Sequence, residues 1–404
     1  MNFLERLMSG HHSGDRIYMD YAAATPLRHE VWEAMRPIYK DVFGNPSGVH
    51  QEGQRARALI EKTREKIARL LTIRTEDVMF TSGGTEANNI AIAGVIEAAW
   101  ADGQPYEEME IITTKLEHPS LTETIKAYGD GAVTVHHAPV DEDGRIILSE
   151  FEKLLSEKTV LVATALINSE VGVIQPTRKL KKLMKEKGNA VLVVDGAQAP
   201  LWHPIQLEVL GADVLTLDAG KCYGPKGAGV IARRHGIALT PSIFGGGQEQ
   251  GLRPGTENLA VIVGMGVALE LAVVGVERRA EGVNELRDYF FASVEKELPD
   301  AVINGSRESG ERAANNVNIS LPGIDTEFAV VVLDEYGVAA STKSACSGAG
   351  GGESTVVKAM TSDAARAKST LRFTLGETSS KQQVDQVVAI LKQHVAKMQK
   401  IDSE

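Results

Sequence analysis

Two apolar runs in the middle of the chain each end in side chains that can do chemistry. Val191–Val194 is followed directly by Asp195, and Val214–Leu217 is followed by a short turn that carries Lys221. In open α/β sheets, ligands bind at the carboxyl ends of strands of this kind. A lysine that is partly desolvated beside an apolar strand end is a candidate for forming a Schiff base.

An acid and a lysine at neighbouring strand ends are the pair that a pyridoxal 5′-phosphate (PLP) enzyme needs. The lysine reacts with the aldehyde of the cofactor, and the acid keeps the pyridinium nitrogen protonated so that the ring accepts electrons. Two ordinary strands that end in solvated polar turns would show the same residues. The pair alone therefore leaves both interpretations open.

A second motif has the composition of a phosphate-binding turn. A strand is predicted over Val78–Ser82, followed by a turn over residues 83–89 and an apolar helix from Ile90. Backbone N–H groups and the helix dipole favour an anion at such a turn, and Thr85 adds a hydroxyl. Glycines also occur in such turns for conformational reasons alone, so this signal is weak without the others.

Cys346 lies among small residues, in the stretch from Ser344 to Gly352. Structural cysteines usually pack among large apolar side chains, so this composition predicts a thiol on a mobile loop. Such a loop can carry a nucleophile to a substrate, although an incidental surface cysteine would look the same. Cys222, directly after Lys221, is expected to pack beneath the strand end. The chain has no CxxC or HExxH spacing, so no metal site is predicted.

The order of the predicted elements indicates an α/β protein with two domains. Strands and helices alternate up to about residue 235, which predicts βαβ units and a largely parallel sheet. A helical region over 259–298, broken near 274–276, precedes the strands and helices of a smaller α+β domain. We predict a large domain over residues 28–270 and a small domain made of residues 1–27 with 271–404, which carries the cysteine loop.

Charge and cysteine content exclude several classes of protein. The 404 residues carry a formal net charge of −11, which argues against nucleic acid as the main partner. No apolar run approaches the roughly 20 residues of a membrane helix, and the first residues lack a signal-peptide pattern. Two cysteines do not make a disulfide framework, so we expect a cytoplasmic protein with no membrane partner.

Eight motifs, in order along residues 17–392, together resemble the cysteine desulfurases. These are fold-type I PLP enzymes of the class V aminotransferase group. The motifs are Tyr18-x-Asp20-Tyr21-Ala-Ala-Ala-Thr25-Pro26, Gly44-Asn45-Pro46-Ser47, Thr81-Ser-Gly-Gly-Thr85-Glu86, Glu117-His118, Val194-Asp195-x-x-Gln198, Lys221-x-Tyr-Gly-Pro-Lys-Gly227, Gly245-Gly-Gly-Gln-Glu-x-Gly251-x-Arg253-x-Gly255-Thr256 and Ser344-Ala-Cys346. The resemblance implies a mainly parallel sheet of the seven-stranded type in the large PLP-binding domain.

The resemblance also implies how the cofactor ring is held. Lys221 would bind the aldehyde and move the proton of the substrate Cα, and Asp195 would pair with the pyridinium nitrogen. Gln198 would bond the phenolic oxygen, and His118 would stack on the ring and take part in proton transfer. Ser169 would lie beside the ring and the substrate.

The cofactor phosphate is implied to lie between two subunits of a homodimer. Gly84 and Thr85 would hold it from one subunit, while Thr256 would reach the phosphate of the partner subunit. The family usually has Ser-x-His before the lysine, and both side chains touch the phosphate. Here Asp218 and Gly220 stand in those places, so a carboxylate lies near a dianion and would repel it unless it turns away or bonds a donor.

The implied reaction converts L-cysteine to L-alanine. Arg372 would clamp the substrate carboxylate and Asn168 would lie beside the substrate. Cys346 would attack the substrate sulfur and keep it as a persulfide for a protein acceptor, an iron–sulfur scaffold or a sulfur carrier that serves tRNA thiolation. The second Asn of the family's Asn-Asn-Glu-x-Gly is replaced by Ser169, which leaves substrate preference open.

Two other functions stay open at this point. A selenocysteine lyase, or another class V lyase or aminotransferase, would keep the cofactor but change the reaction. A non-catalytic sulfur scaffold with a decayed phosphate site would explain Asp218 and Gly220. The presence of Lys221, Asp195 and Arg372 together argues against decay.

Overall fold

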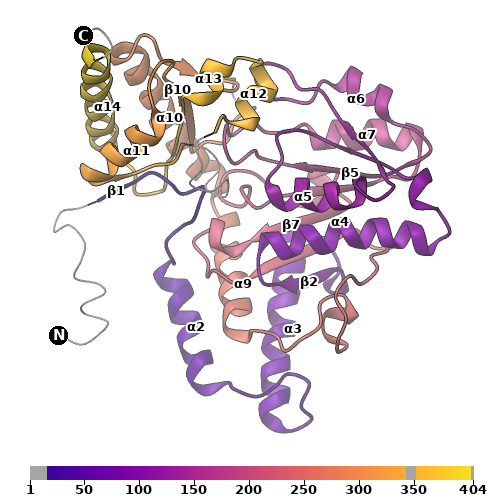
Figure 1. Ribbon diagram of the computed structural model, residues 1–404. Coiled ribbons are helices and arrows are strands. Elements are labelled where there is room, and N and C mark those ends of the chain that lie inside the picture. The colour runs from indigo at the N-terminus through magenta and orange to yellow at the C-terminus, as the bar shows by residue number, and fades with distance from the viewer. Residues whose placement is uncertain (1–15, 309, 343–351, 402–404) are drawn as a thin grey trace.

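The computed structural model describes residues 16–308, 310–342 and 352–401 (Figure 1). The strands are β1 (Ile17–Tyr18), β2 (Val78–Thr81), β3 (Glu110–Thr113), β4 (Thr134–His137), β5 (Thr159–Ala165), β6 (Val191–Asp195), β7 (Val214–Asp218), β8 (Gly229–Arg233), β9 (Val302–Ile303), β10 (Asn316–Ser320), β11 (Val338–Ala339) and β12 (Thr370–Thr374). The helices are α2 (His29–Asp41), α3 (Gln51–Leu71), α4 (Gly84–Ala101), α5 (Pro119–Gly129), α6 (Leu148–Leu154), α7 (Thr177–Lys187), α8 (Leu207–Leu210), α9 (Leu259–Val273), α10 (Val276–Glu297), α11 (Thr326–Glu335), α12 (Thr355–Thr361), α13 (Ala364–Lys368) and α14 (Lys381–Ile401). Short 3-10 turns include η3 (Ala219–Lys221) and η4 (Gln248–Gly251).

A seven-stranded sheet forms the centre of the molecule. Its strand order is β2-β8-β7-β6-β5-β3-β4. Every neighbouring pair is parallel except those made by β8, which is antiparallel to both β2 and β7. The predicted mainly parallel, seven-stranded α/β fold is confirmed. Because β5, β6 and β7 run in the same direction, their carboxyl ends meet at one edge, where a ligand site is expected.

The central strands are apolar without alternation because helices cover both faces of the sheet. In β6, Leu192 and Val194 face the cluster that includes Leu180 of α7, while Val193 faces the cluster that includes Ile92 of α4. Strand side chains point to opposite faces in turn, so a strand with two covered faces reads as a continuous apolar run.

The C-terminal elements form a second, smaller group. β12, β10 and β9 make an antiparallel sheet, and β1 pairs in parallel with β11 through Ile17 and Val338. The indigo N-terminal chain therefore starts beside the orange and yellow C-terminal elements and then continues to α2 (Figure 1). The domain boundary predicted near residue 270 falls inside α9, and the division into two domains stays a prediction.

Helix α4 begins at Gly84, and the prediction of a helix start at Ile90 was wrong. Two side chains bond the backbone at this helix start. The Gly84 N–H donates to Asp218 Oδ2 at 2.9 Å, and the Glu86 carboxylate accepts from the backbone of the preceding turn. These caps stabilise a helix through residues whose composition is typical of a turn.

Helix α9 is apolar apart from Glu270 and packs against α2 and α3. A helix of this composition is typical of a protein core. Within the described residues, no single helix has the length and apolar content to cross a membrane, although α9 and α10, bent by 70°, reach that threshold as a pair.

A buried ion pair ties η4 to the edge of the sheet. Arg64 of α3 donates two hydrogen bonds to Glu249, both of 2.7 Å. Arg64 also donates to the Val78 carbonyl at 2.7 Å, and Glu249 accepts from the Phe80 N–H at 2.8 Å. Glu249 has a φ of 47°, a left-handed backbone conformation that needs such external support.

We expect Glu249→Ala to lower the free energy of unfolding by about 3–5 kcal/mol, because it leaves Arg64 as an unpaired buried charge. Urea unfolding followed by circular dichroism measures this change. The control is Glu270→Ala, which breaks the more exposed pair with Lys66 and is expected to cost less than about 1 kcal/mol. Equal losses in both variants would contradict a supporting role for the buried pair.

Candidate active site

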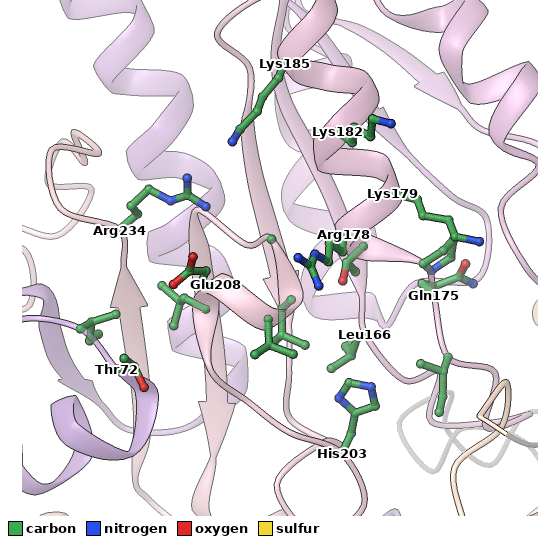
Figure 2. A pocket seen from close by; sticks show the side chains of 18 of the residues that line it. Thr72, Leu166, Gln175, Arg178, Lys179, Lys182, Lys185, His203, Glu208 and Arg234 are labelled. Atoms are coloured by element: carbon green, nitrogen blue, oxygen red, sulfur yellow. The ribbon is translucent and has the colours of Figure 1, made fainter.

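The most spacious of the described cavities contains none of the predicted site residues. It measures about 1080 Å³ and lies along α7 (Figure 2). Its lining is rich in cations, with Arg178, Lys179, Lys182, Lys185 and Arg234 among them. The buried acid in its lining, Asp77, forms ion pairs with Arg233 and His235 and not with a lysine, so size alone does not identify the functional site.

A smaller cavity, of about 160 Å³, lies at the carboxyl ends of β5, β6 and β7. The strand-end argument predicted a site at this edge. Every predicted site residue lines this cavity except Thr256 and Cys346. The lining residues from that set are Gly84, Thr85, His118, Asn168, Ser169, Asp195, Gln198, Lys221 and Arg372.

Thr256 and Cys346 are not placed in the cavity. Thr256 is exposed in the segment after η4, and Cys346 lies outside the described residues. The chain that leads to Cys346 nevertheless begins beside the cavity, because Ser341 and Arg372 bond each other's backbones with N···O distances of 3.1 and 2.6 Å. The roles predicted for Thr256 and Cys346 stay predictions.

The N-terminal segment forms one wall of the cavity. Lys221 Nζ donates to the carbonyls of Ala22 at 2.9 Å and Ala23 at 2.6 Å. Gln198 Nε2 donates to the same Ala22 carbonyl at 2.9 Å. Two of the side chains predicted to contact the cofactor, Lys221 and Gln198, are therefore oriented by one stretch of backbone.

Asp195 is buried and is held by two donors. Its Oδ1 accepts from the Ala197 N–H, and its Oδ2 accepts from Asn88 Nδ2, both at 2.9 Å. Asn88 is itself buried and accepts from Thr216 Oγ1 at 2.5 Å. Sequence analysis missed Asn88 because it placed this residue in a turn, whereas it lies early in helix α4 and points to the sheet edge.

His118 is the N-cap residue of α5, and this position sets its tautomer. The Ser120 N–H donates to His118 Nδ1 at 3.1 Å, so a neutral ring carries its proton on Nε2. Burial lowers the pKa of His118, which favours the neutral ring. Ser120 Oγ lies 2.8 Å from the same Nδ1 and accepts from Asn88 at 2.9 Å, which links His118 to Asp195 through two side chains.

Glu117, directly before His118, is buried and holds the loop to strand β5. Its carboxylate accepts from Thr114 Oγ1 at 2.7 Å, from Thr164 Oγ1 at 2.9 Å and from the Ala165 N–H at 2.7 Å. Burial raises the pKa of Glu117 to about 7. Sequence analysis found Glu117 only as part of the Glu-His motif and gave it no role.

Arg372 lies at the end of the cavity nearest the small sheet. Its Nη2 donates to Asp20 Oδ1 at 2.7 Å, and its Nη1 donates to the Ser169 carbonyl at 3.0 Å. Its Nε is buried and has no hydrogen-bond partner among the described residues. Arg372 lines the cavity, and a guanidinium that is oriented by two such contacts suits the binding of a carboxylate.

The amide of Asn168 is engaged by hydrogen bonds within the protein. The Asn168 amide donates to the Leu116 carbonyl at 2.7 Å, and its oxygen accepts from the Glu170 and Val171 N–H groups, both at 2.9 Å. Asn168 therefore shapes the turn at the cavity.

Cys222 is buried, and burial raises the pKa of its thiol to about 12, so it is not a nucleophile near neutral pH.

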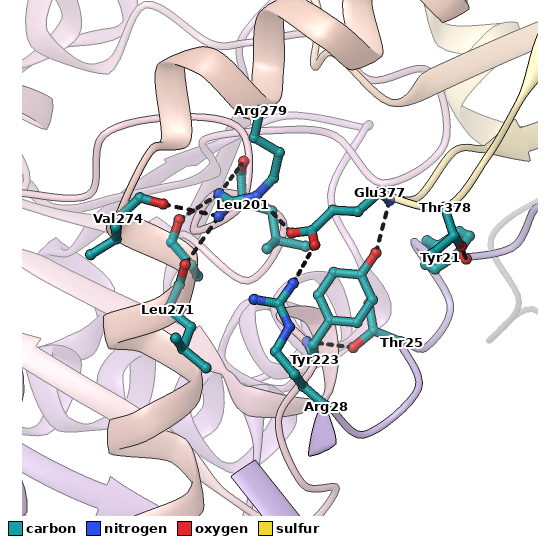
Figure 3. Close-up of polar contacts among 11 residues, drawn as sticks. Tyr21, Thr25, Arg28, Leu201, Tyr223, Leu271, Val274, Arg279, Glu377 and Thr378 are labelled. Atoms are coloured by element: carbon teal, nitrogen blue, oxygen red, sulfur yellow. Dashed lines mark hydrogen bonds and ion pairs between the residues drawn. The ribbon is translucent and has the colours of Figure 1, made fainter. Parts of the chain in front are cut away.

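A junction of charged residues joins the N-terminal segment, the lysine turn and the C-terminal part of the chain (Figure 3). Arg279 of α10 donates to Glu377 at 2.7 Å and to carbonyls at the end of α9, and Arg28 donates to the other carboxylate oxygen of Glu377. The Glu377 N–H donates to the Tyr223 hydroxyl at 3.2 Å. The turn that carries Lys221 is thus fixed from several directions.

Comparison with known proteins agrees with this arrangement. Residues 17–387 match the Aminotransferase class-V family. "Cysteine desulfurase IscS" of Dictyoglomus turgidum is 39% identical over 385 residues, which cover 95% of this chain and 96% of that protein. The chain belongs to the cysteine desulfurases of this family. Among solved structures, a "NifS-like protein" matches with a TM-score of 0.87, 32% identity and coverage of 95% of this chain and all of that one. "SspA in complex with cysteine" matches with a TM-score of 0.75, 29% identity and coverage of 90% and 100%.

The cofactor of these desulfurases is PLP, and the cavity suits it. A buried carboxylate at Asp195, an amine at Lys221 and an amide at Gln198 converge on one space, as the ring chemistry requires. The start of α4 offers N–H groups to a phosphate, but Asp218 already bonds the first of them.

We expect Glu117 to make the stability of the protein depend on pH. Its pKa of about 7 in the folded state lies above its ordinary value of 4.5, so folding takes up a proton between these two pH values. The stabilising contribution is complete below pH 4.5 and is lost as pH rises through about 7. As the pH is raised from 4.5 to about 7, the wild type should lose this contribution and Glu117→Gln should not. The melting temperature of Glu117→Gln should therefore increase with pH relative to that of the wild type.

Differential scanning calorimetry across this pH range measures the effect. Glu123→Gln is the matched control, because Glu123 is exposed on the following helix α5. Melting profiles of Glu117→Gln and the wild type that run parallel over the whole range would show that Glu117 does not titrate there.

Proposed function

We propose that this chain converts L-cysteine to L-alanine and keeps the sulfur as a persulfide on Cys346. The observation that carries this proposal is the meeting of Lys221, Asp195 and His118 in one cavity beside Arg372. The strand of Arg372 also pairs with the chain that leads to Cys346. These contacts support a reaction in which the proton transfers and the sulfur transfer take place at the same cavity.

Each side chain has a defined task in this reaction. PLP, when bound, withdraws electrons from the substrate Cα and so weakens the bond between Cβ and sulfur. Asp195 keeps the ring nitrogen protonated, Arg372 binds the substrate carboxylate, and Lys221 moves the Cα proton. His118, with its proton on Nε2, is a donor for a second proton transfer.

The sulfur transfer balances without an external oxidant. The Cys346 thiolate attacks the substrate sulfur, an S–S bond forms and the Cβ–S bond breaks. The sulfur is oxidised while Cβ gains a proton and is reduced to the methyl group of alanine. The persulfide then passes to an acceptor, which we propose is a protein of the iron–sulfur scaffold or sulfur-carrier type. A reactive thiol of this kind needs a reducing compartment, which supports a cytoplasmic location.

We propose that the chain forms a homodimer through the surface around α2 and the segment before η4. Phe43, Val49 and Phe244 are 83–87% exposed there, and Trp32 and Tyr39 of α2 are also exposed. Residues 46–47 and 247–250 line one common pocket, so the two loops lie side by side. Large exposed aromatic groups on neighbouring loops favour burial against a second subunit. Such a dimer gives Thr256 a route to the phosphate of the other subunit.

We expect the chain to elute at twice its mass of 43.4 kDa in size-exclusion chromatography with light scattering. A double variant, Phe43→Glu with Phe244→Glu, should shift it toward the monomer, because two buried charges oppose association. Tyr336→Glu, at an exposed aromatic residue after α11, is the control and should leave the dimer intact. A monomeric wild type would contradict the proposed dimer.

The reaction is tested by measuring alanine and sulfide from L-cysteine in the presence of a thiol reductant. We expect equal amounts from the wild type, and loss of both products by about two orders of magnitude or more in Cys346→Ala, with bound PLP unchanged. Cys222→Ser is the control and should retain activity, because Cys222 is buried and protonated.

Two results would redirect the proposal. Activity that survives in Cys346→Ala would make a lyase or aminotransferase the better description of the chain. A strong preference for L-selenocysteine over L-cysteine would favour a selenocysteine lyase.

A further inference from the structure

Asp218 occupies the place at the cavity edge where an anion is expected. It is the last residue of β7, directly before the turn that carries Lys221. One carboxylate oxygen accepts from the Gly84 N–H at 2.9 Å, and the other accepts from the Gly220 N–H at 2.7 Å. The first N–H groups of a helix lack partners within the helix, so a carboxylate there is stabilised by both the hydrogen bond and the helix dipole.

The glycines around Asp218 leave room for this carboxylate. A Cβ atom added at Gly84 would lie 3.2 Å from Asp218 Oδ2, and one added at Gly220 would lie 3.1 Å from Oδ1. Both distances are tighter than ordinary van der Waals contact. The two departures from the family pattern are therefore linked: Gly220 leaves the space and supplies the N–H group for the Asp218 carboxylate.

We propose that the Asp218 carboxylate is an internal substitute for the cofactor phosphate and that it lowers the affinity for PLP through the phosphate alone. This inference rests on the proposed placement of the cofactor in the Lys221 cavity. The carboxylate and the phosphate compete for the N–H group of Gly84, and their like charges repel each other. The remaining N–H groups at the start of α4 and the Thr85 hydroxyl still allow PLP to bind, with reduced affinity.

The same contact stabilises the protein without its cofactor. Asp218 satisfies two backbone donors and connects β7 to the start of α4. Its loss should therefore lower the stability of the cofactor-free protein while it raises the affinity for PLP. A residue with a purely structural role would change both quantities in the same unfavourable direction.

The test compares binding of PLP and of pyridoxal, which lacks the phosphate, to the cofactor-free protein. Absorbance titrations give both dissociation constants for the wild type and for Asp218→Asn, which removes the charge with little change in shape. We expect PLP affinity to rise about tenfold or more and pyridoxal affinity to stay the same. The melting temperature of the cofactor-free variant should fall by a few degrees, as for a lost helix cap.

Two further variants support the interpretation of this result. Asp218→Ser gives a second neutral residue in case Asp218→Asn folds poorly, and it should also raise PLP affinity. Asp102→Asn makes the same charge change at the opposite end of α4, where Asp102 is the exposed C-cap, and should leave both affinities unchanged.

An unchanged ratio of PLP to pyridoxal affinity in both Asp218 variants would overturn the inference, as would weaker PLP binding or none. The titration does not depend on turnover of L-cysteine. A protein that binds PLP as described but releases no alanine would therefore contradict the proposed function and leave the role of Asp218 standing.

Discussion

The candidate active site depends on a short stretch of the N-terminal segment, residues 20–25. The carbonyls of Ala22 and Ala23 orient Lys221 and Gln198, which lie in the turns after β7 and β6 of the large sheet. The carboxylate of Asp20 orients Arg372, which belongs to the small sheet. Lys221 and Gln198, predicted to bind the cofactor, and Arg372, predicted to bind the substrate, therefore come from different sheets, and all three contact this stretch.

The same stretch also fixes the turn that follows the lysine. Thr25 Oγ1 donates to the Gly220 carbonyl at 3.0 Å and accepts from the Tyr223 N–H at 2.6 Å. Tyr223 has a φ of 60°, and such a backbone persists only where its surroundings hold it. Arg28 and Glu377 then extend the contact to the C-terminal part of the chain. The position of Lys221 is therefore set by long-range contacts as much as by its own strand.

Site residues could be predicted where the signal lies in neighbouring residues of the sequence, and not where it depends on contacts between distant parts of the chain. Asp195 was found because it directly follows an apolar run, and Lys221 because it lies in the short turn after another such run; both signals are local. Asp20 was recognised only as part of a motif, since its partner Arg372 is 352 residues away and no pattern within a window connects them. The helix start at Gly84 was missed for the same reason, because one of its caps, Asp218, comes from a distant strand.

Asn88 shows the consequence of that missed helix start. In a turn, its side chain would have no defined direction, but one turn into α4 it points to the sheet edge and bonds Asp195 and Ser120 together. Losing any one of these hydrogen bonds would leave a buried polar group of Asn88 without a partner, which costs free energy. The Asn88 amide therefore holds the groups around it in fixed positions. Through Ser120 this order reaches the His118 ring, whose proton position is thereby set before any substrate binds. Asp218 caps the same helix through the Gly84 N–H, at the anion end of the cavity.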